Sequence, residues 1–414
     1  MLRNYLVTAL KVLQRRKFFT FVNLFAVALT LAVLTVVITL VENFVRPLGA
    51  ESRSDHYLAV SEARIATEDG NSSWDSRLGY RMLERHVLPL EEPDLIGFFN
   101  GPSQGTVYVD GSKLTPKVAR TDANYWSILD FRFLEGRPIS QADFDEGRFV
   151  AIINRSMREA IFAGEPALGQ SLSASGQRFE VIGVVEDEAA IRREAFSEIW
   201  VPLTTTPSTN YRVEWVGDFT ALLFAEDASR LPAIRAELLA SMDEFVHDDP
   251  DRYQVANAVA NSKFEQLARM ALDNPHGRDS KVGAFIMVVI AVTIAFMLLP
   301  AINLINLNVS RILERASEIG VRKAFGASAR SLVGQFLVEN LVLSVLGGIA
   351  GFILGIGLLD LIERSGLIPY GDFRIDWRVF LGSLVAMTAF GLISGVYPAW
   401  KMARFNPVRA LRGG

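Results

Sequence analysis

Few residues of this chain have the type and spacing that catalysis requires. The four histidines, His56, His86, His247 and His276, are scattered, and no H-E-x-x-H motif places two of them on one helix face. No G-x-S-x-G motif offers a serine nucleophile. The chain has no cysteine, which excludes disulfide scaffolds, thiolate zinc sites, iron–sulfur clusters and cysteine nucleophiles. The sequence therefore predicts a protein that is not an enzyme.

Two weaker signals remain. Asp248 and Asp249 follow His247, and the three side chains could contribute to a metal site, although an exposed acidic loop is the expected structure. No glycine is followed by lysine anywhere in the chain, so a P-loop, which needs a lysine to reach the phosphates, is excluded. We expect no metal, no cofactor and no nucleotide hydrolysis in this chain on its own.

The elements that must position any functional residue are largely membrane helices. Half of the 414 residues are apolar and 21% are charged, and the mean hydropathy is +0.24. A membrane-spanning helix needs about 20 apolar residues. Four stretches without a charge pass this test, between Lys17 and Glu42, Lys281 and Arg311, Glu339 and Asp360, and Arg378 and Lys401. The first is longer than the core of a cleaved signal peptide, the alternative, so we expect an anchor.

Basic residues near the ends of the spans predict the orientation. The segment before the first span, the connection between the second and third, and the tail together hold 14 basic and two acidic residues. Since loops rich in lysine and arginine stay in the cytoplasm, both termini and the middle connection are expected there. The formal net charge of −4 gives no basic excess, so no nucleic-acid partner is expected.

The predicted fold class is an α-helical membrane protein with four transmembrane helices and a large mixed α/β extracytoplasmic domain between the first two. Residues 1–17 are predicted to form an amphipathic helix at the inner interface, with an extension of the first span as the alternative. The other predicted parts are transmembrane helices at 18–45, 281–310, 331–360 and 379–400, the extracytoplasmic domain with a stalk at 46–280, a cytoplasmic loop at 311–330, a short extracytoplasmic loop at 361–378 and a cytoplasmic tail at 401–414.

The large domain has mixed sequence patterns. Short apolar runs bounded by polar residues or glycine predict strands at 107–109, 149–153, 179–185 and 220–224. Helical periodicity is found at 156–162 and 231–246. Residues 255–272 have a helical composition and lead toward the second span, so we expect a helical stalk there.

The third span carries a stripe of small residues. Gly347, Gly351 and Gly355 recur every fourth residue, with Gly348 beside them. Such a stripe lets helix backbones approach closely. It predicts helix packing within one subunit, with packing between subunits as the alternative. Glu339 begins the span, where we expect an interfacial or helix-paired carboxylate, with proton coupling as the alternative.

The cytoplasmic connection after the second span has the pattern of a short helix. Its charges alternate in sign at spacings of three and four residues, at Arg311, Glu314, Arg315, Glu318 and Arg322. Apolar side chains among them are suited to a groove on a partner. Taken alone, the segment is also consistent with an ordinary charged loop.

The wording of this loop, however, resembles the signature of MacB/FtsX-type permeases of the ABC transporter superfamily. In that family the loop reads close to R-x-x-E-I-G-[IV]-R-[KR]-A-[LF]-G-A, followed by Q-F-x-x-E. Here residues 318–327 read E-I-G-V-R-K-A-F-G-A, and residues 335–339 read Q-F-L-V-E. The end of the chain is similar to the family's Y-P-A-x-x-A-[AS]-x-x-x-P-[IV]-x-A-L-[RK]. Segments that look like its periplasmic core domain are N-Y-W at 124–126, L-E-G-R at 134–137, P-A-L-G at 166–169 and V-I-G-V-V at 181–185.

The resemblance implies a permease without its own ATPase. In fused members the ATPase domain precedes the first span, where only 17 residues stand here, so a separate ATPase subunit that binds ATP and magnesium is the expected partner. The family's loop helix docks on that subunit. The residues carried over to this ATPase-coupling role are Glu314, Arg315, Glu318, Ile319, Gly320, Val321, Arg322, Lys323, Ala324, Phe325, Gly326 and Ala327.

The function implied is mechanotransmission in the inner membrane, in which ATP-driven motion is conveyed through the stalk to the extracytoplasmic domain. Further expected partners are a second permease copy or a related permease, membrane lipid and a periplasmic adaptor. The expected process is export of a substrate such as an antimicrobial, a peptide or a lipid-linked molecule. The alternatives are lipoprotein release, FtsX-like regulation of an external hydrolase, and a membrane-anchored sensor or binding module.

Overall fold

The computed structural model describes residues 7, 11, 14, 15, 17–109, 111–163, 165–314, 329–373 and 377–403. The chain forms two compact units. The helical unit is drawn from Met1–Glu42, Ile286–Leu367 and Asp372–Gly414, and the α/β domain from Asn43–Phe285 and Ile368–Gly371. The α/β domain therefore includes four residues from a distant part of the chain. The predicted amphipathic helix at 1–17 lies largely outside the described residues.

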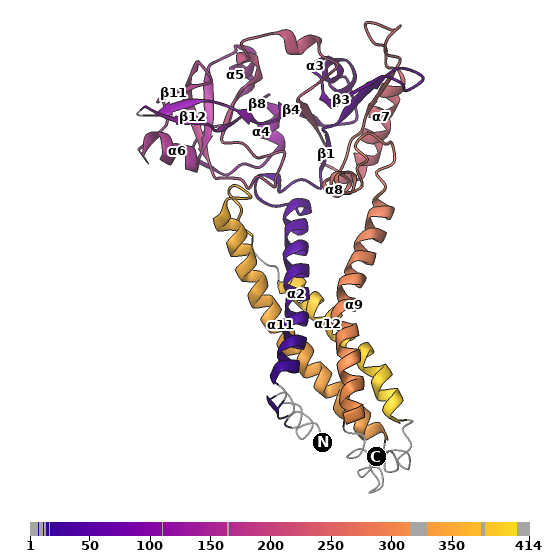
Figure 1. Ribbon diagram of the computed structural model, residues 1–414. Helices are drawn as coiled ribbons and strands as arrows, with labels where there is room; N and C mark the ends of the chain where they lie inside the picture. Colours follow the sequence, from indigo (N-terminus) through magenta and orange to yellow (C-terminus); the bar gives the residue numbers. More distant parts are fainter. Residues whose placement is uncertain are drawn as a thin grey trace. The chain divides into compact units, whose positions relative to one another are not determined.

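Long apolar helices form the helical unit (Figure 1). They are α2 (Lys17–Val45), α9 (Val282–Glu314), α11 (Ala329–Ser365) and α12 (Trp377–Ala403). Among the described residues, three stretches are long and apolar enough to span a membrane, namely Thr20–Val45, Val282–Asn303 and Leu337–Ser365. α12 contributes the shorter apolar stretch Phe380–Ile393. The fourth predicted span therefore stays a prediction.

One large sheet organises the α/β domain. Its strands in the described part of the chain are β1 (Tyr57–Val60), β2 (Ala63–Ala66), β3 (Ser73–Leu78), β4 (Leu95–Asn100), β5 (Ser103–Gln104), β6 (Val107–Val109), β7 (Ser112–Leu114), β8 (Lys117–Thr121), β9 (Phe133–Gly136), β10 (Val150–Asn154), β11 (Ser171–Ala174), β12 (Gln177–Val185), β13 (Ile199–Pro202), β14 (Val216–Gly217), β15 (Phe219–Phe224) and β16 (Val255–Ala258). Their main order is β16-β2-β3-β15-β4-β8-β13-β10-β12-β11-β6-β7. β10 with β12 and β13 with β8 are parallel pairs within an otherwise antiparallel sheet.

Short helices cover the sheet. They are η1 (Gly49–Glu51), α3 (Tyr80–Met82), η2 (Leu83–Val87), α4 (Asn124–Ile128), α5 (Gln141–Asp145), α6 (Arg155–Phe162), η3 (Leu203–Thr205), η4 (Asn210–Val213), η5 (Ala228–Arg230), α7 (Leu231–Asp243) and α8 (Lys263–Ala271). Side-chain caps fix several starts, because an acceptor there satisfies a backbone N–H that the helix leaves unpaired. Ser262 and Glu265 form a reciprocal capping box on α8, and Asn154 caps α6.

The apolar core of the domain has three parts. One lies around α3, η2 and α7 and includes Leu78, Met82 and Leu238. The second is aromatic: Trp200, fully buried on β13, packs edge-on against Trp126, with ring centroids 5.9 Å apart. The third lies between α6 and the strands β10 to β12. Because β8, β13 and β10 are adjacent, one continuous sheet connects the three.

Within the α/β domain, the predicted strands and helices overlap observed ones except near the second span. The strand predictions match β6, β10, β12 and β15, and the helix predictions match α6 and α7. The predicted helical stalk at 255–272 is wrong in its first part. Residues 255–258 form strand β16, paired antiparallel with β2, and the helix begins only at Lys263. Alternate burial along β16 is typical of a strand whose two faces differ, and sheet pairing overrides the helix preference of its two alanines.

Candidate functional site

The predicted ATPase-coupling residues 315–327 lie outside the described residues. Glu314 is the last residue of α9, and the next described helix, α11, begins at Ala329. The coupling role of this loop therefore stays a prediction from the sequence.

The glycine stripe of the third span faces α2. A Cβ atom built on Gly347 would lie 2.5 Å from Cγ1 of Val27, and one on Gly351 would lie 2.7 Å from the carbonyl oxygen of Ala28. Gly355 is looser, since its Cβ would be 3.6 Å from Thr35. The missing side chains thus let α11 approach the backbone of α2 in the same chain.

α12 packs on another face of α11. A Cβ on Gly348 would collide with Leu384 of α12, and one on Gly391 would collide with Ser344 of α11. Glu339 is 1% exposed inside this unit, and neighbouring polar side chains, Asn340 and Ser344, are also buried. Across the bundle, the Asn303 amide of α9 donates a hydrogen bond of 3.1 Å to Asn23 of α2. Buried hydrogen-bonded polar groups of this kind link membrane helices.

A buried ionic cluster lies in the α/β domain where the chain arrives from α2. Lys263, at the first position of α8, pairs with Glu51 at 2.7 Å and also with Glu194. The three side chains are only 3%, 2% and 4% exposed. Glu51 also accepts hydrogen bonds from the backbone N–H groups of Glu194 and Ala195, and Gln266 donates to Glu194. These bonds satisfy most of the capacity of the charged groups, as burial requires.

A second pair of charged residues fixes the turn just before Glu51. The carboxylate of Glu188 accepts a 2.8 Å hydrogen bond from the N–H of Ala50 and lies 3.5 Å from Nε of Arg192. Arg192 also donates to the carbonyl of Leu48. Gly49 has a φ of 56°, and a Cβ there would lie 2.7 Å from Glu188, so only glycine fits both the left-handed turn and the carboxylate. We call residues 48–51, residues 186–198 and α8 the junction.

Burial raises the pKa of Glu188 to about 7, although its bond to Ala50 and the charge of Arg192 oppose the shift. Because the native state holds this proton more tightly than the unfolded chain, stability falls as pH rises from the unfolded pKa of 4.5 to about 7, and is constant above. Glu188 alone is expected to account for a loss of up to about 3 kcal/mol in the free energy of unfolding across this pH range. Melting of the detergent-solubilised chain at pH 5, 6, 7 and 8 should show it.

The matched variant is Glu188→Gln, which should remove part of this pH slope. Asp122, whose pKa burial also raises to about 7, retains its own share, so the slope should be roughly halved and not abolished. Glu159→Gln, on the exposed side of α6, is the control. An unchanged slope in Glu188→Gln would contradict the assignment.

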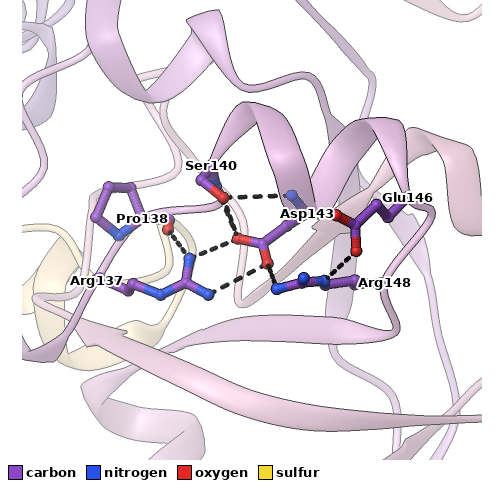
Figure 2. Close-up of polar contacts among 6 residues, drawn as sticks. All are labelled: Arg137, Pro138, Ser140, Asp143, Glu146 and Arg148. Carbon is purple, nitrogen blue, oxygen red and sulfur yellow. Dashed lines mark hydrogen bonds and ion pairs between the residues drawn. The ribbon is translucent and has the colours of Figure 1, made fainter.

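A further charged network stabilises the opposite part of the domain (Figure 2). Asp143, fully buried on α5, accepts from Arg137 at 2.5 and 3.2 Å and from Arg148 at 3.4 Å. It also forms the capping box with Ser140. The bond from Arg137 holds the pKa of Asp143 well below its usual range. The bonds from Ser140 lower this pKa further. This arrangement is structural, because both arginines are engaged by the one carboxylate.

The metal alternative at His247, Asp248 and Asp249 is not supported. The Asp248 carboxylate is 2.8 Å from Arg81 and 3.4 Å from Arg85, and it accepts from the indole N–H of Trp215. Within the described ranges, no group of three or more histidine, aspartate or glutamate side chains is arranged to hold a metal ion. Asp248 instead anchors its loop to α3 and η2.

Comparisons with known families identify the chain as a whole. Residues 20–241 match the MacB-like periplasmic core domain, and residues 285–407 match the FtsX-like permease C-terminal domain. The first match alone covers more than half of the chain. The chain belongs to the MacB/FtsX-type family of ABC transporter permeases. The α/β domain of the permease is thus of the periplasmic core type, and α9, α11 and α12 belong to its FtsX-like part.

The curated relatives of the permease include an ABC transporter permease and two ATP-binding/permease proteins. It is 28% identical over 290 residues to the uncharacterized ABC transporter permease YknZ of Bacillus subtilis, covering 70% of this chain and 68% of YknZ. It is 27% identical over 284 residues to the macrolide export ATP-binding/permease protein MacB of Bdellovibrio bacteriovorus, covering 67% of this chain and 41% of MacB. The pyoverdine export ATP-binding/permease protein PvdT of Pseudomonas fluorescens is 26% identical over 322 residues, covering 75% of this chain and 45% of PvdT.

The permease therefore spans less than half the length of these two export proteins. Among solved structures, the periplasmic region of MacB from Actinobacillus actinomycetemcomitans aligns with a TM-score of 0.37 and 16% identity, covering 54% of this chain and 94% of that chain.

Sequence reasoning missed the junction of the permease. Glu51, Glu194 and Lys263 lie in three separate parts of the chain, and each alone has the appearance of a solvated charge. The only local signal is the position of Lys263 directly after the capping serine of α8. Tyr370, in the loop between α11 and α12, was also not singled out, because a tyrosine in a short polar loop has no distinctive pattern.

Proposed function

We propose that this permease is the membrane subunit of a MacB-like ABC transporter, powered by a separate ATPase subunit that binds ATP and magnesium. The observation that carries the proposal is the order of the two family matches along one chain, with a core domain at 20–241 and an FtsX-like part at 285–407. The absence of a Gly-Lys dipeptide supports a second chain as the site of hydrolysis. The permease chain would be non-catalytic and would act as a dimer with itself or with a related permease.

The path of force is proposed to start at residues 314–327, which dock on the ATPase. Movement would reach the α/β domain through the helices, whose close packing at Gly347 and Gly351 supports transmission as rigid bodies. The basic segments that flank the spans support cytoplasmic termini and an α/β domain on the outer side of the inner membrane.

Export is the proposed outcome, of a substrate such as an antimicrobial, a peptide or a lipid-linked molecule. The names of MacB and PvdT, which are export proteins for a macrolide and for pyoverdine, support this class. A periplasmic adaptor and membrane lipid are further proposed partners.

The test is co-purification of the tagged permease from its native host in mild detergent, with and without Glu318→Ala combined with Arg322→Ala. We expect mass spectrometry to find a stoichiometric P-loop ATPase with the unmodified chain and a loss of about tenfold or more in the double variant.

The matched control is Asp360→Ala with Arg364→Ala. This pair has the same spacing and the same change of charge, and its side chains lie at the end of α11 with 51% and 77% exposure. It should retain the ATPase. Equal recovery in all three preparations would remove the loop from the coupling role. If no ATPase is recovered under conditions in which a known transporter keeps its own ATPase, the result would favour a sensor or binding module.

A further inference from the structure

The loop between α11 and α12 is bound to the α/β domain. Residues Ile368–Gly371 belong to that domain by their contacts, although the chain before and after them belongs to the helical unit. The carbonyl oxygen of Pro369 accepts a 2.9 Å hydrogen bond from the N–H of Ala190. The ring of Tyr370 lies 6.3 Å from the ring of Phe196. Both partners are in residues 186–198 of the junction.

The hydroxyl of Tyr370 binds to a polar site on the α/β domain. It donates to Oε1 of Glu198, whose other oxygen accepts a 2.6 Å hydrogen bond from the backbone N–H of Lys117. Burial, and then the bond to Glu198, raises the pKa of the Tyr370 hydroxyl, so it stays a proton donor at neutral pH. The carboxylate of Glu198 would lose a hydrogen-bond partner if the loop left.

The docked loop is also strained. Tyr370 has a φ of 57°, in the left-handed region that bulky residues rarely adopt. Such a conformation persists only where surrounding contacts hold it. Among the described residues, the contacts named above are one backbone bond, one side-chain bond and one ring contact. By comparison, the cluster of Glu51, Lys263 and Glu194 is fully buried and joined by several charged bonds. The loop contact is thus the weaker of the two attachments made by residues 186–198.

We propose that Ile368–Gly371 is a releasable latch, with Tyr370 and Glu198 as positioning residues that hold it closed. Residues 186–198 bind the turn after α2 through Glu188 and Arg192, and they bind the latch through Ala190 and Glu198. One segment therefore connects the chain leaving α2 with the chain between α11 and α12. Opening of the latch separates them while the ionic cluster keeps α8 in place. The expectation that the latch opens during the ATPase cycle, tested below, rests on the proposed function.

The first test needs no ATPase. Hydrogen–deuterium exchange of the full chain in detergent follows the amide of Ala190, which exchanges when its bond to Pro369 opens. We expect Tyr370→Phe, which removes only the hydroxyl, to raise exchange in peptides covering residue 190 by about tenfold. Peptides from β12 should not change. Tyr108→Phe, on exposed β6, is the matched control. Unchanged exchange at residue 190 in Tyr370→Phe would overturn the latch.

The second test locks the latch. The chain has no cysteine, so Ala190→Cys with Pro369→Cys introduces a single pair, and the direct backbone bond brings the two residues within reach of a disulfide. In the complex with its ATPase, oxidation should lower ATP hydrolysis at least about fivefold, and reduction should restore it. Ser173→Cys with Arg178→Cys, which face each other across β11 and β12, is the control pair and should leave hydrolysis unchanged.

The outcomes separate the two proposals. If the complex with the oxidised 190–369 cysteine pair hydrolyses ATP at the full rate, the latch need not open. This result would overturn the latch proposal while the transporter assignment stands. If no ATPase co-purifies, the transporter assignment fails, and the exchange experiment alone decides whether Tyr370 holds the loop.

Discussion

Replacing Gly351 by alanine is expected to lower the apparent melting temperature of the detergent-solubilised permease by about 5–10 °C. The new Cβ would lie 2.7 Å from the carbonyl oxygen of Ala28 and 2.9 Å from Cβ of Leu31. Neither atom is the end of a flexible side chain, so α2 and α11 must move apart. Separation removes the contacts along the whole stripe, because two packed helices shift as rigid rods.

The same helix offers the control. Outside its own helix turn, no atom of the described residues lies within 4 Å of the position of a Cβ on Gly357, so Gly357→Ala should leave the melting temperature unchanged or raise it slightly through better helix propensity. Gly355→Ala should be intermediate, since its nearest neighbour would be at 3.6 Å. Equal melting of Gly351→Ala and Gly357→Ala would show that α11 does not pack on α2 in this way.

Lys263→Met is expected to destabilise the permease by about 3–5 kcal/mol, because it leaves Glu51 and Glu194 buried without their cation. Methionine retains much of the lysine's shape, so the effect should come from charge and not from a cavity. The measurement is the folded, monodisperse fraction after size-exclusion chromatography, together with the apparent melting temperature. Lys113→Met, at an exposed position of β7, is the control and should change neither.

A second variant distinguishes charge from packing at Lys263. Combining Lys263→Met with Glu51→Gln and Glu194→Gln removes all three charges, while the glutamine oxygens can still accept from the backbone N–H groups. We expect this triple variant to recover most of the lost stability. A triple variant less stable than Lys263→Met would indicate that the carboxylates have another role than balancing the lysine.

Local patterns explain what the sequence predicted. β15 could be predicted because Phe219–Phe224 is a short, continuous apolar run that the fold buries on both faces. The glycine stripe could be found because its spacing of four residues places the glycines on one helix face before any partner is known. β16 was missed because Val255–Ala258 is short and contains two alanines, so its strand conformation depends on pairing with β2.

Contacts between distant residues explain what the sequence did not predict. The partners Glu51 and Glu194 are separated by more than 140 residues, and nothing near either of them marks a buried charge. The latch joins Ala190 to Pro369 through the backbone, and a backbone bond can form with almost any residue type at those positions. The ionic cluster and the latch both form only after the fold has brought residues 186–198 together with Glu51 and Pro369.

The membership of Ile368–Gly371 in the α/β domain has a consequence for synthesis. Residues 43–285 are synthesised before this loop and contain every strand of the described sheet, but the tyrosine that fills the site at Glu198 is made only after α9 and α11. The site at Glu198 therefore stays without Tyr370 until that loop has been synthesised. If α11 inserts in the wrong direction, its loop emerges on the wrong side of the membrane and the place stays empty. Occupation of the Tyr370 site therefore requires that the loop after α11 lie on the same side of the membrane as residues 43–285.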